Sequence, residues 1–509
     1  KFEGMLVRVT SPMTLTGGFN LQTFGEMEIS SGGRLFTPTQ VAEPGAAANS
    51  VLASYDARRV ILNDFSRQSN ITSIPYYPSF SATNTLRAGV EVNPNWTAVV
   101  DYRFGAYQLN PTVVLTLNTA TNPRPSAPAS VGTGSRVFKV AGSNVLNFFT
   151  TLNSRGANTA GELATQRAKI VAALRTLDAD VIGLTEIQNN GATLPISDSQ
   201  AIGNLLNALN ATPGDQYTLV PTGGSLGSDL ITQAIIYKPS RVTPIGSFAS
   251  QANAGTGRVN LAQRFRPFDG SRTDLQEFTV VVVHWKSKSS SGASGADADQ
   301  NDGQGAYNAT RVQIANDTVS WLASNPTSDP NPAGSRKVVL VGDFNAYRQE
   351  DPIDVMVGAG YKPLLDFFTQ GFLYYSYNFD NMSGALDHAI ASTAFERVTT
   401  GTVEYHINAD EPAAIDYNTE DSKPASWTDT TQYRASDHDP VLVGFNPLTG
   451  DFDNDGDVDS ADAAIMRAAI GKPASSVDRR IDMDGDGVIS LNDNRLFTLA
   501  ARAFTIVGI

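Results

Sequence analysis

The stretch KVVLVGDFN, residues 337–345, decides the fold of the central part of this chain. It opens with an apolar run over 338–341 and turns polar at Asp343 and Asn345. An apolar run without alternation is typical of a strand that is buried on both faces, inside a sheet covered by helices. The polar residues therefore stand at the end of a buried strand, on the rim of a sheet.

Three other segments of the central region change from apolar to polar in the same way, and a fourth is a polar cluster that precedes an apolar run. They are VFKVAGSN ending at Asn144, VIGLTE ending at Glu186, FTVVVVH ending at His284, and ASDHDP, with Asp437 and His438, just before the run VLVGF. Helical periods over 161–177 and 307–323 lie between these runs. The alternation predicts packed strands and helices, with the polar strand ends along one rim.

The residue types at this rim suit metal-assisted hydrolysis. Converging carboxylates and amides favour a hard, oxygen-preferring cation such as Mg²⁺ or Mn²⁺. The chain has only four histidines, at positions 284, 388, 406 and 438, and those at 388 and 438 directly follow an aspartate. Histidines near such a cation supply a general base, a general acid or charge stabilisation. Together, these residues predict a catalytic site.

The order of these motifs resembles the endonuclease/exonuclease/phosphatase superfamily, which includes the deoxyribonuclease I-like enzymes. The matching elements are Asn144, Glu186, His284, GDFNA (342–346), LDH (386–388) and SDH (436–438). HWKSKSS (284–290), GQGAYNATR (303–311), YSYNFD (375–380) and HINADEP (406–412) further resemble bacterial extracellular nucleases of the ExeM/NucH type. The resemblance implies an α/β (α+β) four-layer sandwich over residues 135–447, with two packed mixed β-sheets flanked by helices.

The resemblance also implies roles for single residues. Glu186 would bind the metal, with Asn144 beside it on metal or phosphate and Asp437 near the metal. Asp343 and Asn345 would hold the attacking water and the phosphate oxygens. These residues would polarise the phosphate and orient the water, as phosphodiester hydrolysis requires.

The two rim histidines would move protons or stabilise charge. His438 would be the general base or its electrostatic equivalent, oriented by Asp387. His284 would contact the phosphate or assist the leaving oxygen, with Asp229 as its orienting partner. Three further contacts with the phosphate backbone are expected, from Arg266 in RFRPF and from Lys286 and Lys288 after the strand that ends at His284.

The expected activity is hydrolysis of phosphodiester bonds in DNA outside the cell, with RNA as a further substrate left open. Cleavage within the strand or from its ends, and the use of one or two metal ions, are also left open. One alternative is a phosphodiesterase or phosphatase of the same superfamily that acts on lipid or inositol phosphates. Another is a calcium-dependent scaffold that binds nucleic acid without hydrolysing it.

The region 1–130 predicts a small β domain. Short β-type runs over 5–10, 99–104 and 112–117 alternate with Gly, Pro and Asn, and no helical period is evident. It resembles an oligonucleotide/oligosaccharide-binding (OB-fold) barrel, for which single-strand binding and a purely structural role are both open. The stretch TATNPRPSAPASVGTGS, 119–135, predicts a linker because it is rich in Pro, Ser and Gly.

The C-terminal region 450–503 carries two calcium-loop patterns. DFDNDGDVDSAD (451–462) and DMDGDGVISLND (482–493) place Asp at loop positions 1, 3, 5 and 12 and Gly at position 6. The predicted Ca²⁺ ligands are Asp451, Asp453, Asp455, Asp457, Asp462, Asp482, Asp484, Asp486, Val488 and Asp493. The pattern resembles a small α-helical dockerin module, which implies a cohesin-like or cell-surface partner.

Composition limits the remaining classes. The net charge of −14 argues against a protein that coats nucleic acid, although a local cationic groove still suits a nuclease. The absence of cysteine excludes disulfides and thiolate metal sites. No segment approaches the length of an apolar membrane span, and the start at Lys1 indicates a processed product. Secretion follows from the resemblance and the calcium loops.

Overall fold

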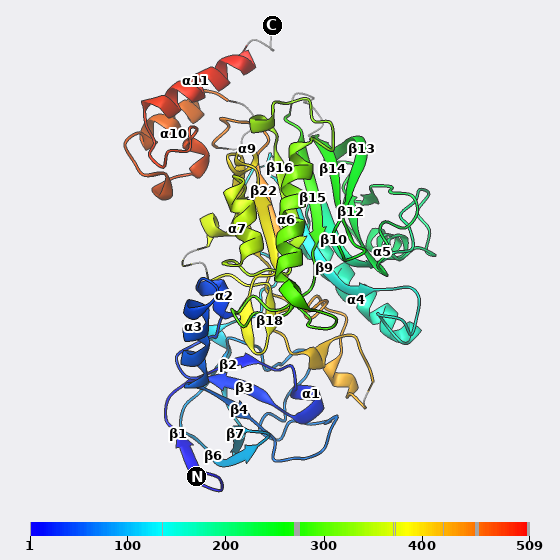
Figure 1. Cartoon of the computed structure of the whole chain (residues 1–509), viewed down its shortest axis with the longest axis vertical. Helices are drawn as coiled ribbons and strands as arrows, with labels where there is room; N and C mark the ends of the chain where they lie inside the picture. The colour runs from blue at the N-terminus through cyan, green and yellow to red at the C-terminus, as the bar shows by residue number, and fades with distance from the viewer. Residues whose placement is uncertain are drawn as a thin grey trace.

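The computed structural model describes residues 2–134, 136–268, 275–369, 371, 373–420, 422–453 and 458–505. None of the helices in these residues combines the length and the apolar character that a membrane span requires. Figure 1 shows the N-terminal region at one end, the central region in the middle and the C-terminal helices beside the opposite end.

The central region is built on two mixed sheets within the described residues. The first has the order β11 (Thr218–Leu219), β12 (Ile231–Tyr237), β10 (Val181–Gln188), β9 (Phe138–Phe148), β22 (Val441–Phe445) and β21 (Thr399–Glu404). The second has the order β13 (Val242–Ala252), β14 (Val259–Pro267), β15 (Phe278–His284), β16 (Val338–Asp343), β20 (Asp387–Ala391) and β17 (Lys362–Pro363). The pairs β9–β10 and β15–β16 are parallel, and the other pairs are antiparallel.

The two sheets pack face to face through a shared apolar core. This core contains Val140 and Val181 of the first sheet and Val282 and Val341 of the second. Gly183 allows the close approach, because a Cβ atom there would lie 2.5 Å from a methyl of Val282. The apolar runs of the sequence are therefore buried on both faces, as predicted.

Helices cover the outer faces of both sheets (Figure 1). The helices α4 (Ala160–Leu177) and α5 (Ala201–Asn210) pack on the first sheet, and α6 (Asn308–Ala323) and α7 (Asp351–Gly358) pack on the second. The helices predicted over 161–177 and 307–323 are confirmed to within one residue. Shorter elements of this region are α8 (Leu365–Phe368), α9 (Thr393–Glu396), β18 (Tyr377–Phe379) and β19 (Met382–Gly384).

The N-terminal region contains a sheet and three helical segments among its described residues. The strand order is β1 (Leu6–Val9), β6 (Trp96–Arg103), β7 (Ala106–Pro111), β4 (Arg59–Leu62), β3 (Met27–Ser30), β2 (Met13–Gly17), β5 (Glu91–Val92) and β8 (Leu117–Asn118). The helices are α1 (Leu21–Phe24), α2 (Pro38–Val41) and α3 (Ala46–Asp56). The OB-fold assignment stays a prediction.

Two expectations for the N-terminal region are wrong. The sequence showed no helical period, yet α3 spans eleven residues; only Ala48 and Tyr55 of it are buried, so its apolar face is too narrow to give a clear period. Most of the run 112–117 lies outside a strand, and the chain forms β7 just before it.

Residues 119–134, which we call the strap, are not a flexible linker. Val131 of the strap is 2% exposed and packs into the core of the central region. Its carbonyl accepts a hydrogen bond from the Thr400 hydroxyl at 2.5 Å. Arg124 forms a two-pronged ion pair with Glu411, with both contacts at 2.8 Å. A composition rich in Pro and Ser indicates that helix and strand are absent, but it does not indicate that packing is absent.

The C-terminal region forms a small core of its own. The helices α10 (Ser460–Ala469) and α11 (Leu491–Thr505) follow the two calcium-loop patterns. Phe452, Met466, Ile481, Ile489 and Phe497 are buried together between the loops and these helices. An Arg397 guanidinium donates to the Asp484 carbonyl at 3.2 Å, which links this region to the central one.

Candidate active site

The rim is formed where parallel strands end together. In the second sheet, β15 and β16 are in register, so that His284 faces Asp343. In the first sheet, β9 and β10 place Asn144 opposite Thr185, one residue before Glu186. Because the two sheets are packed face to face, these strand ends meet at one edge of the sandwich.

Glu186 sits at a distortion of strand β10. The pairing of β10 with both neighbours shifts register at this residue, and its backbone has φ 64°. Leu146 and Asn147, on the facing strand, also have positive φ, and the Asn147 N–H donates to a Glu186 oxygen at 2.9 Å. Non-glycine residues in this conformation cost free energy, and such strain gathers at functional sites.

Burial and the nearby Asp437 raise the pKa of Glu186, whereas His438 and Asn144 lower it. Asp437 is partly exposed and accepts a hydrogen bond from the Ser436 hydroxyl at 3.4 Å. The side-chain amide oxygen of Asn144 accepts from the Leu146 N–H at 2.8 Å. These three predicted metal or phosphate residues are thus neighbours in space.

His284 lies between the carboxylates of Glu186 and Asp343. Its Nε2 atom is 3.4 Å from Asp343 Oδ2 and 3.9 Å from Glu186 Oε1. Burial lowers the pKa of His284 well below its ordinary value, and Arg258 and His438 lower it further. His284 is therefore a neutral imidazole near pH 7.

Asp343 is held by the loop that follows its strand. The Asn345 N–H and the Asn345 side-chain amide donate to its two oxygens at 2.8 Å and 3.0 Å. Asn345 itself has φ 50°, and its amide also donates to the Trp285 carbonyl at 3.2 Å. Burial raises the pKa of Asp343 to about 7, partly offset by His438.

His438 is paired with Asp387. Their Nδ1 and Oδ2 atoms are 2.6 Å apart, and the Ser376 hydroxyl donates to the same oxygen at 2.8 Å. Tyr377 packs its ring against the imidazole at 4.4 Å between centroids. Burial would lower the pKa of His438, but Asp387 and Asp437 hold it well above its ordinary value. His438 is therefore an imidazolium ion near pH 7.

The family model of the Endonuclease/Exonuclease/phosphatase family matches residues 144–438, from the Asn144 rim position to His438. The chain belongs to this family. Its members are phosphodiesterase and nuclease hydrolases, and the chain is a hydrolase of this type. A second model, the dockerin type I domain, matches residues 449–496.

Several solved structures are similar to part of this chain at low sequence identity. An endonuclease/exonuclease/phosphatase family protein from Bacteroides thetaiotaomicron is 17% identical, with 60% of this chain and 97% of that chain covered and a TM-score of 0.36. The human Nocturnin catalytic domain is 13% identical, covering 61% and 94%, with a TM-score of 0.37. A mannosyl-6-phosphatase from Bacteroides thetaiotaomicron is 17% identical, covering 60% and 98%, with a TM-score of 0.35. None of the curated proteins compared matches the chain.

Two histidines of this family member lie outside the catalytic cluster. His388 Nε2 is 2.8 Å from the Ala346 carbonyl, and burial lowers the pKa of His388. His406 pairs with Asp439 at 2.9 Å and stacks on the Tyr375 ring at 4.0 Å. His388 thus fixes the loop at Ala346, and His406 fixes the loop at Asp439.

Asp229 is not the orienting partner of His284. Its two oxygens contact Arg258 at 3.0 Å and Arg155 at 3.3 Å. Among the described residues, none hydrogen-bonds to His284 Nδ1. Arg258 also donates to the Trp285 carbonyl at 2.9 Å, beside His284. The carboxylate of Asp229 is thus occupied by these two arginines.

Two predicted phosphate contacts are also corrected. Arg266 is bound to Glu277. Because its strand β14 is antiparallel to β15, Arg266 lies near the start of β15, whereas His284 lies at the end of β15. Lys288 is partly buried and pairs with the buried Glu350 at 2.5 Å, and desolvation lowers the pKa of Lys288 to about 8. Lys286 is partly exposed and lies 4.2 Å from the centre of the Tyr307 ring.

Sequence reasoning missed Arg258, Arg155, Ser376 and Tyr377 near the cluster. Arg258 and Arg155 lie in polar loop segments with no distinguishing pattern. Ser376 and Tyr377 stand within the quoted YSYNFD motif, which gave a signal for the segment but no role for either residue.

The carboxylates at the rim suit a divalent cation. Asp343 is buried, Glu186 is partly exposed, and both have raised pKa values, so their negative charges are poorly compensated by the chain itself. A cation held by Glu186, with Asn144 and Asp437 nearby, would offset this charge and polarise a phosphate oxygen.

The C-terminal acidic residues form two candidate calcium sites. Oxygen atoms of Asp451, Asp453 and Asp462 lie within 4.8 Å of one another, as do those of Asp482, Asp484 and Asp486. Asp493 accepts N–H donors from Met483 and Ser490 and so closes the second loop. Val488 lies in that loop, and Asp455 and Asp457 lie outside the described residues.

Proposed function

We propose that this protein is a divalent-metal-dependent nuclease that hydrolyses phosphodiester bonds of DNA outside the cell. The observation that carries the proposal is the pair of histidines with opposite pKa shifts at a rim of buried carboxylates. When environments push the pKa values of two groups apart, one group is placed to accept a proton and the other to donate one.

The pKa directions suggest a division of roles. Neutral His284 can accept a proton from the attacking water. His438, kept charged by Asp387, can stabilise the phosphate charge and donate a proton to the leaving oxygen. This reverses the roles expected from the family resemblance, where His438 was the base.

The metal and its ligands form the second part of the proposal. Glu186 would hold Mg²⁺ or Mn²⁺, with Asn144 and Asp437 beside it, and Asp343 would hold the attacking water. The bound ion would supply charge neutralisation to the phosphate. Asn345 would position the phosphate through the loop that fixes Asp343.

DNA as the substrate rests on the sequence motifs of the extracellular nucleases and on local charge. Arg258, Arg155 and Lys286 gather beside His284, although the whole chain is acidic. A cationic edge of this kind attracts a phosphate backbone. Lys286 and Arg258 are the residues that we expect to contact it.

The flanking regions would serve attachment. We assign 1–130 to an OB-like domain, 135–447 to the catalytic domain and 450–503 to a calcium-binding dockerin module. Dockerin domains bind cohesins, so a cohesin-like or cell-surface partner would hold the enzyme outside the cell.

A plasmid-nicking assay tests the proposal. The full chain is incubated with supercoiled plasmid and Mg²⁺ or Mn²⁺, with and without chelator, beside His438→Ala, His284→Ala and the control His388→Gln. We expect nicking by the wild type and the control, and a loss of 10²- to 10⁴-fold in each site variant. RNA, a phospholipid and an inositol phosphate are assayed in parallel. Hydrolysis of one of these with intact plasmid would contradict the proposal.

A further inference from the structure

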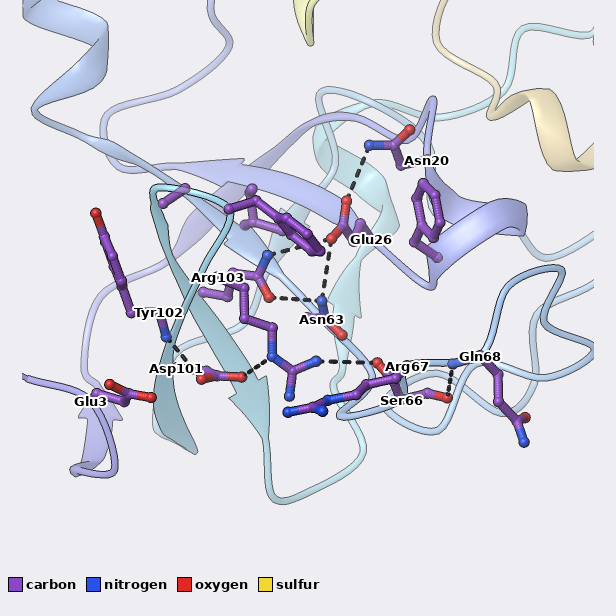
Figure 2. Close-up of a pocket in the computed structure, with 15 residues that line it drawn as sticks. Glu3, Asn20, Glu26, Asn63, Ser66, Arg67, Gln68, Asp101, Tyr102 and Arg103 are labelled. Atoms are coloured by element: carbon purple, nitrogen blue, oxygen red, sulfur yellow. Dashed lines mark hydrogen bonds and ion pairs between the residues drawn. The ribbon is translucent and has the colours of Figure 1, made fainter.

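A second site lies in the N-terminal region, apart from the catalytic rim. A cavity of about 890 Å³ opens between α1, β4 and the β6–β7 hairpin. Its size is within the range of about 300–1,000 Å³ that small-molecule sites occupy. Figure 2 shows polar side chains from several separate segments turned toward one space. No residue of the catalytic cluster lines it.

The floor of the cavity is a fixed group of amides around one carboxylate. Glu26 accepts hydrogen bonds from Asn20 at 3.1 Å, Asn63 at 3.3 Å and Gln108 at 3.4 Å (Figure 2). Asn63 also donates to Gln108 at 2.8 Å, and both of these amides are buried. A carboxylate has about four acceptor positions, so Glu26 can accept further donors from a ligand.

The walls of the cavity carry exposed aromatic rings. Phe24 and Tyr102 are 44% and 48% exposed, and Phe104 is 99% exposed. Phe104 and Gly105 form the two-residue turn between β6 and β7, and both have positive φ, at 50° and 84°. This turn favours Asn-Gly, and a bulky residue with positive φ is strained. The exposed ring of Phe104 thus occupies a turn position where the backbone conformation favours a small polar residue.

The charge of the cavity lining argues against binding of a phosphate backbone. Its lining holds three carboxylates, Glu3, Glu26 and Asp101, and two guanidinium groups, Arg67 and Arg103. Arg103 is paired with Asp101 and donates to the Ser66 carbonyl at 3.3 Å. Single-stranded nucleic acids are bound by basic grooves in which cations neutralise phosphates. An anionic ligand therefore does not suit this cavity, whereas a neutral ligand avoids repulsion by its carboxylates.

We propose that this cavity binds a neutral oligosaccharide. A pyranose ring presents an apolar C–H face, which stacks on rings such as Phe104 and Tyr102, and hydroxyl groups, which donate to a carboxylate and to amide oxygens. The combination of aromatic walls with a fixed polar floor at Glu26 matches both faces of such a ligand. The protein then holds a glycan with its N-terminal region while the central region hydrolyses phosphate esters.

Calorimetric titration of the full chain in Ca²⁺ tests this proposal. The probes are cellohexaose, xylohexaose, mannohexaose, laminarihexaose and chitohexaose, and a fifteen-residue oligothymidylate is titrated into His438→Ala. We expect saturable binding of at least one hexaose. Phe104→Ala and Glu26→Ala should weaken it at least tenfold, and Phe379→Ala, which removes an exposed ring outside the cavity, should not.

A folding control accompanies the binding measurement. Phe104→Asn places a residue that tolerates positive φ in the turn, so its Tm should equal or exceed that of the wild type while hexaose binding is lost. Plasmid nicking should not change. Absence of binding by every hexaose at millimolar concentration, or equal binding by the Phe104 variants, overturns the proposal. Phe104-dependent binding of the oligothymidylate instead would assign the cavity to nucleic acid.

Discussion

The pairing of His438 with Asp387 gives a test at the scale of one residue. In the variant Asp387→Asn, the His438 imidazole keeps a polar neighbour at position 387 but loses the negative charge that raises its pKa. We expect kcat to fall about 10²- to 10³-fold. The decrease in activity on the high-pH side of the profile should also move to lower pH. Without the Asp387 charge, His438 has a lower pKa and loses its proton at a lower pH. A steady-state pH profile measures both effects.

The control for this test is His388→Gln, in which the amide can keep a hydrogen bond to the Ala346 carbonyl. Its pH profile should match that of the wild type. An unchanged profile for Asp387→Asn, together with a lower kcat, would contradict the role given to His438 and leave Asp387 with a structural role only.

Glu28, in the N-terminal sheet, gives a second residue-scale prediction. Burial raises its pKa to about 7, although Arg59 lies 3.8 Å away and Thr16 donates at 3.2 Å. Because the pKa is higher in the folded state, the unfolded state loses its proton first. The free energy of unfolding therefore falls as pH rises from about 4.5 to 7.

The variant Glu28→Gln mimics the protonated side chain and removes this pH-dependent cost. At pH 8 it should raise the free energy of unfolding by about 2–3 kcal/mol, and at pH 4 it should have little effect. Tm measurements at the two pH values test this. An equal shift at both pH values would show that packing, rather than the proton, is responsible.

At the scale of elements, the strap and the loop 406–412 are joined by a buried ion network. Glu411 binds Arg124 and Arg87 at 2.8 Å, and Asp410 binds Arg34 at 2.7 Å and Arg87 at 2.9 Å. Burial would raise the pKa of Asp410, but Arg34 and Arg87 hold it below its usual range. The stability that this carboxylate adds is present above its unfolded pKa and is lost as pH falls.

The variant Glu411→Gln should destabilise the protein by about 3–5 kcal/mol, because two buried guanidinium groups lose their charged partner. Thermal unfolding, followed for the transition of the central region, measures the effect. Asp198→Asn, at an exposed site, should leave Tm unchanged. If the Tm of Glu411→Gln changes as little as that of the control, the ion network does not stabilise the folded protein.

At the scale of the whole molecule, the calcium module is expected to unfold independently of the rest. Its core contains only residues of the C-terminal region, and its clustered carboxylates repel one another without a cation. Chelation of Ca²⁺ should remove helical circular dichroism equivalent to α10 and α11 and open this region to protease. Asp482→Ala should reproduce the effect in the presence of Ca²⁺, whereas the Tm of the central region should stay constant. A chelator-insensitive spectrum would contradict this prediction.

The N-terminal region is joined to the loops that carry the catalytic rim. Thr39 donates to Glu350 at 2.8 Å, and the same carboxylate binds Lys288, four residues after His284. Asn408, two residues before Asp410 of the ion network, donates to the His438 carbonyl at 2.6 Å. The N-terminal region thus stabilises the loops of the site. Lys288 and Arg34 form ion pairs with Glu350 and Asp410 and are therefore not available to bind a ligand.

The sequence by itself determined the strands, the rim residues and the calcium loops. A strand buried on both faces must be apolar along its length, so Glu186, His284 and Asp343 stand out at the strand ends. A calcium loop draws its ligands from twelve consecutive residues, so its pattern is complete in the sequence. Only the tertiary structure decided the partners of Asp229, Arg266 and Lys288, the docking of the strap, and the saccharide cavity around Glu26. These depend on contacts between segments far apart in the chain, and side-chain type alone does not reveal which of the available opposite charges or cavities each residue meets.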